Sequence, residues 1–78
     1  PFDDFTRTGR IWGAILGLPD VPPEKVALCL IGVKISREVN APKRDNRVDM
    51  AGYAEALDLV LQRRATATVA PVGPSLGE

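Results

Sequence analysis

Asp45 and Asp49 are the two side chains in this sequence whose type and spacing could best support chemistry. In a helix, carboxylates four residues apart share one face and repel each other by roughly 0.2–0.5 kcal/mol. Three partners could offset this repulsion: the positive end of the helix dipole, neighbouring cations, or a divalent metal ion, because hard cations prefer carboxylate oxygens. Asp45 and Asp49 are therefore candidate Mg²⁺ ligands.

A structural role for the same two residues is the simpler interpretation, and we favour it. Asp45 can cap the start of a helix, with Asn46 as an alternative cap, and Asp49 in the first turn gains from the dipole. Arg44 and Arg47 are close enough in sequence to pair with these carboxylates. On this interpretation we predict no cofactor and assign no catalytic residue, with Mg²⁺ as the alternative.

Lys34 and Arg37 are the cations that could meet these aspartates from another helix. They could instead lie on a solvated face, where a Lys34–Glu38 pair would contribute about 0.3 kcal/mol. A short loop after them, however, makes the two helices antiparallel and places Lys34 and Arg37 opposite Asp45 and Asp49. There they would form ion pairs or bind a phosphate, arginine with a bidentate fork.

The elements that position these residues are three helices, predicted at about 4–16, 23–39 and 45–64. Aspartates before Phe5, a Pro-Pro pair before Glu24 and Asp45 itself favour the three starts. Gly17 and Pro42 favour the ends of the first two. We expect residues 1–64 to form one helical domain. Residues 65–78 have no helical period, and we expect an extended or disordered tail that could contact a protein partner.

Residues 26–33 are apolar on every side, which in a helix indicates burial all round. A buried strand is the alternative, but the Pro-Pro-Glu-Lys start favours a helix. Gly9 and Gly13 either let another helix approach closely or only loosen the first helix, at roughly 1 kcal/mol each. Two neighbours cannot cover so apolar a central helix. We therefore predict a three-helix antiparallel module completed into a bundle by oligomerisation, most simply a twofold dimer. The residues expected in the core or dimer interface are Trp12, Leu28, Leu30, Ile31, Tyr53 and Leu57.

Composition narrows the function classes. The 10 basic and 10 acidic residues give zero net charge, which argues against a dedicated nucleic-acid binder. There is one cysteine, Cys29, and no histidine, so disulfides within the chain and zinc patterns are excluded. No segment resembles a transmembrane helix or a signal peptide, so we expect no membrane contact and an intracellular location, in a host cytoplasm or a phage particle.

Three blocks of the sequence resemble a family of small phage-encoded domains of unknown function. The first is residues 10–12, the second joins residues 26–28 with residues 33–37, and the third is residues 45–53. The resemblance covers roughly residues 5–61. The third block is also similar to the last ligand-bearing helix of the MazG-like all-α nucleoside triphosphate pyrophosphohydrolases, which implies a magnesium role for Asp45 and Asp49. Those enzymes carry a Glu-Glu-x-x-Glu cluster on the preceding helix, where this chain has apolar residues, Lys34 and Arg37.

These observations predict a phage-encoded helical interaction module that self-associates and does not catalyse a reaction. The alternative is a minimal or degenerate MazG-like protein that binds or hydrolyses a nucleotide with magnesium. A third possibility, contact with nucleic acid through Lys43, Arg44 and Arg47, is disfavoured by the zero net charge.

Overall fold

The computed structural model describes residues 1–69, which form three helices and no strand. They are α1 (Phe2–Leu16), α2 (Pro23–Asn40) and α3 (Arg44–Val69). The predicted all-α, three-helix module is therefore confirmed. The predicted starts and ends agree within two residues, except at the end of α3.

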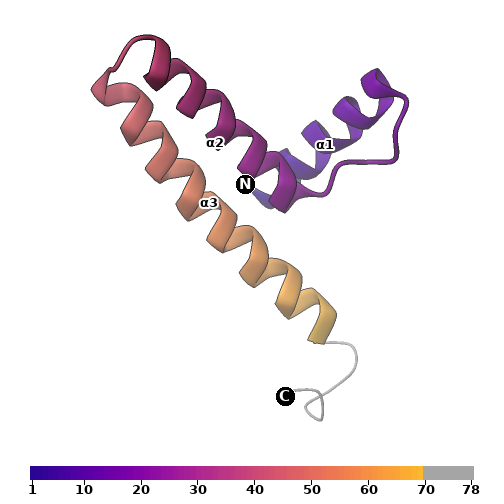
Figure 1. The fold of residues 1–78 in the computed structure, drawn as a ribbon. Helices are drawn as coiled ribbons and strands as arrows, with labels where there is room; N and C mark the ends of the chain where they lie inside the picture. The colour runs from indigo at the N-terminus through magenta and orange to yellow at the C-terminus, as the bar shows by residue number, and fades with distance from the viewer. Residues whose placement is uncertain (70–78) are drawn as a thin grey trace.

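The core lies between α2 and α3, which pack side by side as an antiparallel hairpin (Figure 1). Val26, Ala27 and Val60 are the fully buried apolar side chains among the described residues. Of the six residues predicted for core or dimer packing, Trp12, Leu30, Ile31, Tyr53 and Leu57 are half-buried, whereas Leu28 is 53% exposed. The hairpin has a thin core because few of its apolar side chains have neighbours on all sides.

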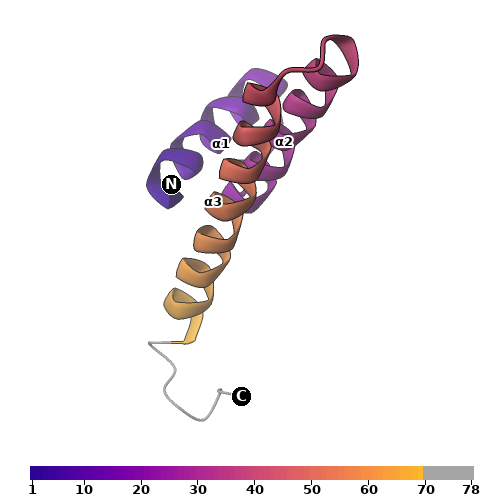
Figure 2. The ribbon, with the colours of Figure 1, turned by 90° about the vertical axis from the view of Figure 1, so that its left-hand side faces the viewer.

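Helix α1 packs at the open end of the hairpin and diverges from it along its length, as Figure 1 shows. In the view of Figure 2, α1 lies behind the hairpin. Two contacts hold its first turn against α3. The Arg63 guanidinium lies 4.7 Å from the centre of the Phe2 ring, and its Nη2 lies 3.6 Å from Oδ1 of Asp3. Arg64 makes a third link, 3.3 Å from Glu24 at the start of α2. These contacts place all three helices together at one end of the molecule.

The ends of α1 and α2 follow local chemistry. Gly17 adopts the left-handed conformation at φ 69° and closes α1, as predicted. Pro23 occupies the first turn of α2, where the missing N–H costs nothing. The predicted aspartate caps of α1 are wrong, because the helix already begins at Phe2 and places Asp3 and Asp4 inside its first turn. There they gain from the helix dipole instead.

The predicted end of α3 is also wrong. The helix continues through residues 65–69, where an extended tail was predicted, and residues 70–78 lie outside the described residues. Residues 65–69 lack an apolar period but contain neither glycine nor proline. Alanine has the highest helix propensity, so the two alanines in this stretch favour continuation of the helix. The absence of an apolar period was therefore a poor guide to its end.

Gly9 and Gly13 are needed for a close approach, mainly to the segment that connects α1 and α2, although Val26 of α2 also lies near Gly9. A Cβ on Gly9 would lie 1.8 Å from the carbonyl oxygen of Val21, and one on Gly13 would lie 2.7 Å from that of Pro19. The Val21 N–H donates to the Gly9 carbonyl at 3.1 Å. The two glycines therefore let residues 18–21 lie directly on α1.

We predict that Gly9→Ala destabilises the chain by about 2 kcal/mol or more, because the methyl group would displace a hydrogen-bonded backbone. Gly52→Ala is the matched control, since a Cβ at Gly52 meets nothing within 4 Å. That control should stabilise the chain by up to about 1 kcal/mol through helix propensity. Urea unfolding of both variants tests the contrast, and equal stability of the two would contradict it.

Candidate functional site

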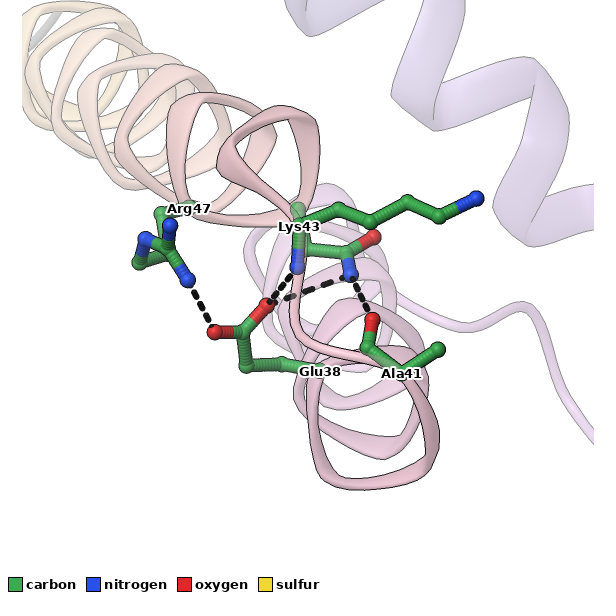
Figure 3. A network of polar contacts seen from close by, with 5 residues as sticks. Glu38, Ala41, Lys43 and Arg47 are labelled. Carbon is green, nitrogen blue, oxygen red and sulfur yellow. Dashed lines mark hydrogen bonds and ion pairs between the residues drawn. The ribbon is translucent and has the colours of Figure 1, made fainter.

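The closed end of the hairpin is organised by one carboxylate, Glu38 (Figure 3). One of its oxygens accepts a hydrogen bond from the Lys43 backbone N–H at 3.0 Å and another from the Asn46 side chain at 3.2 Å. The other oxygen pairs with the Arg47 guanidinium. Asn46, which is buried, also donates to the Ala41 carbonyl at 3.4 Å. Glu38 thus ties the end of α2 to the loop and to the first turn of α3.

These donors lower the pKa of the Glu38 carboxyl below its usual value. The hydrogen bond from the Lys43 backbone has the largest effect, partial burial opposes it, and the contacts with Asn46 and Arg47 add to it. Each of these donors stabilises the ionised form, which is the form that can accept them all. Glu38 is therefore held as a carboxylate in the folded chain.

Lys34 and Asp49 form the second link across the hairpin. The Lys34 ammonium lies 2.8 Å from Oδ2 of Asp49, and the two side chains are 18% and 44% exposed. This contact confirms the predicted cross-helix arrangement for these two residues. The alternative Lys34–Glu38 pair is wrong, because Glu38 turns to Arg47 and Lys34 turns to α3.

An open groove of about 390 Å³ lies beside the Lys34–Asp49 pair. Its lining comes from the ends of both helices and the loop between them: Lys34, Arg37, Asn40, Ala41, Lys43, Asp45, Asn46 and Asp49. The structure therefore brings all four predicted site residues to one place. Within the described residues, the ion pairs found here include Lys34 and Asp49 but not Arg37 or Asp45. Arg37 and Asp45 reach the groove without neutralising each other.

The groove residues do not fit a magnesium site. Lys34 occupies Asp49, which leaves Asp45 as the carboxylate free to bind an ion. In the part of the chain that the structure describes, no three acidic, cysteine or histidine side chains lie close enough together to hold a metal. Mg²⁺ prefers octahedral oxygen ligands and usually takes at least one or two carboxylates together with phosphates. Asp49 would have to release Lys34 before it could act together with Asp45.

The contacts of Glu38 were not predicted from the sequence, and the predicted cap of α3 is wrong. The helix begins at Arg44, so Asp45 lies inside the first turn and is not its cap. Asn46, the alternative cap, points back to Glu38 and Ala41. The useful signal was an acid before the loop and an arginine nine residues later, but this spacing has meaning only once the path of the loop is known.

We predict that the Glu38 carboxylate stabilises the fold most at neutral pH. Since its pKa is lower in the folded chain, this contribution is present above the unfolded pKa and is lost as the pH falls through the folded pKa. Glu38→Gln should therefore be less stable than the natural chain at pH 7, and the difference should shrink at acidic pH. Urea unfolding from pH 7 to pH 3 measures it.

Glu55→Gln is the control for this experiment, because Glu55 is exposed and has no ion pair among the described residues. A constant stability difference between the Glu38→Gln variant and the natural chain across this pH range would contradict the role of the charge.

Comparison with known proteins gives one finding. The family model described as a domain of unknown function (DUF6378) matches residues 1–61. No curated protein and no solved structure matches the chain. None of the described helices is long and apolar enough to cross a membrane. The matched range contains α1, α2, the Glu38 contacts and the groove, and it confirms the expectation of an uncharacterised domain family. The chain belongs to the DUF6378 family of domains of unknown function.

Proposed function

We propose that this chain is a phage-encoded helical interaction module that self-associates and has no catalytic role of its own. The observation that supports self-association most strongly is the amount of apolar surface left exposed. Eleven large apolar side chains are at least 43% exposed: Ile11, Ile15, Leu16, Leu18, Leu28, Val33, Ile35, Val39, Val48, Leu59 and Leu61. Scattered exposed apolar residues are normal, but here they outnumber the fully buried ones.

The thin core makes a partner energetically useful. Burial of apolar surface stabilises a fold by roughly 25 cal/mol for each Å², and chains of this size usually need a disulfide, a metal or a partner subunit. The single cysteine, Cys29, is free and exposed. Association with further copies would bury part of the exposed apolar surface and add stabilisation.

The charge distribution supports copies of this chain as the partner. With zero formal net charge, two copies meet no overall repulsion, and proteins near zero net charge associate readily.

The proposed absence of catalysis rests on a separate observation: Asp49 is engaged by Lys34, so the two candidate metal ligands do not act as a pair. The phage origin rests on the resemblance of residues 10–53 alone.

We predict that the natural chain sediments as a dimer or a higher oligomer at micromolar concentration. Sedimentation velocity over a concentration series measures this, and the melting temperature should rise with concentration because association stabilises the folded state. A monomer mass at every concentration, with a constant melting temperature, would overturn the proposal.

The second candidate function is a magnesium-dependent nucleotide binder or pyrophosphohydrolase of the MazG-like kind. The groove supports the phosphate-binding part of this function, though not the metal, because Arg37 and Lys43 line it with no carboxylate partner among the described residues. A triphosphate would need such cations, and the Arg37 guanidinium suits a phosphate group.

We predict no change in melting temperature when Mg²⁺ and a panel of nucleoside triphosphates are added to the natural chain. Binding at about 100 times the dissociation constant would add roughly 2.7 kcal/mol, which a thermal melt readily detects. A shift that disappears in Arg37→Gln would favour the nucleotide function instead. Lys25→Gln is the matched control, since Lys25 is an exposed cation of α2 outside the groove.

A further inference from the structure

One side of α2 carries a continuous apolar stripe with no cover. Leu28, Gly32, Ile35 and Val39 follow one another at four, three and four residues, which places them on one helix face. We call these four residues the α2 outer face. Leu28, Ile35 and Val39 are 53%, 50% and 81% exposed. No charged residue stands among the four.

Two other sides of α2 contact neighbouring helices, one near Val26 and one near Lys34. Val26 faces α1, since its Cγ2 would lie 3.3 Å from a Cβ on Gly9, and Lys34 faces α3 through Asp49. At 100° for each residue, Leu28 lies roughly 160° around the helix from Val26. The α2 outer face is therefore turned away from α1 and lies beside the α3 contact.

We propose that two copies of this chain pack their α2 outer faces together, antiparallel about a twofold axis. This inference rests on the self-association proposed above and adds the interface. A second copy fits because the face is uncharged, so that a copy brings no like charge to it and buries the same apolar side chains from both sides. Two hairpins joined in this way form a four-helix bundle, in which α2 gains its third neighbour.

Gly32 supports close packing at the centre of this interface. It lies in the middle of α2 and is exposed, and a Cβ there would meet nothing within 4 Å. Nothing within the described chain requires a glycine at a position where it weakens the helix. In the antiparallel arrangement, Gly32 of one copy faces Ile35 of the other, so a small residue receives a large one on each side of the axis.

The charges at the two ends of the hairpin favour the antiparallel direction. Residues 34–49, at the closed end, contain five basic and three acidic side chains. Residues 1–25 and 55–64 contain five basic and six acidic side chains. An antiparallel pair places the positive end of each copy beside the negative end of the other, and it also aligns the two α2 dipoles favourably.

Ile35→Glu tests the interface, with Ile15→Glu as the matched control. Both residues are exposed isoleucines in helices, and Ile15 lies on α1 away from the proposed contact. A glutamate buried in an apolar interface without a partner should weaken the dimer roughly a hundredfold or more. We expect sedimentation velocity to give a monomer for Ile35→Glu and a dimer for Ile15→Glu, with circular dichroism confirming that both are helical.

The outcomes separate this inference from the proposed function. A dimer in Ile35→Glu, or a monomer in Ile15→Glu, would overturn the α2 interface and leave self-association standing. A monomeric natural chain would overturn both.

A comparison of Gly32→Ala with Gly52→Ala gives a milder test, because both substitutions raise the helix propensity of the chain. Gly32→Ala should weaken dimerisation roughly tenfold by overpacking the interface, and Gly52→Ala should leave dimerisation unchanged.

Cross-linking decides the direction of packing. In a Cys29→Ser background, Leu28→Cys and Val39→Cys are prepared separately and then mixed. In an antiparallel dimer, residue 28 of one copy lies near residue 39 of the other, while like residues lie roughly 16 Å apart along the axis. We expect disulfides only in the mixture. Disulfides in each variant alone would indicate parallel packing and overturn the antiparallel arrangement.

Discussion

The packing of α2 against α3 determines where the other described residues lie. It buries Ala27 and Val60 completely and brings Lys34 to Asp49. A helix inside a bundle needs neighbours around most of its circumference, and α2 has two. Leu28 follows Ala27 directly in sequence and is half exposed, so the step from full burial to solvent takes one residue. The uncovered side of α2 follows from this geometry.

Glu38 makes the packing specific. Where apolar side chains of similar size make the contact, one helix of an antiparallel pair can shift along the other by a turn at small cost in free energy. The Glu38 carboxylate prevents such a shift, because it can reach its three donors in one register only. Its contacts with the Lys43 backbone and with Asn46 fix the loop, and its contact with Arg47 fixes the first turn of α3. With that register, Lys34 meets Asp49 and the groove opens beside them.

The sequence predicted the parts of this structure that depend on near neighbours. The helix boundaries, and with them the antiparallel hairpin, were predicted from Gly17, the Pro22-Pro23 pair and Pro42. The hairpin in turn predicted the contact between Lys34 and Asp49. The contacts of Glu38 were not predictable in this way, because Asn46 and Arg47 approach it only through the conformation of a three-residue loop. Gly9 and Gly13 show the same limit. Their spacing predicted a close approach to a helix, but the nearest atoms belong to the backbone of residues 18–21.

The Lys34–Asp49 pair determines which kind of ligand the groove favours. Lys34 is mostly buried, so an ion that displaced it from Asp49 would leave an ammonium with little solvent and no partner, which is costly. A ligand that brings its own negative charge avoids this cost, because its phosphate can take the place of Asp49 beside Lys34. The groove therefore favours an anion over a free metal ion. The apolar side of α2 needs no such exchange, since a second copy adds contacts there without breaking any.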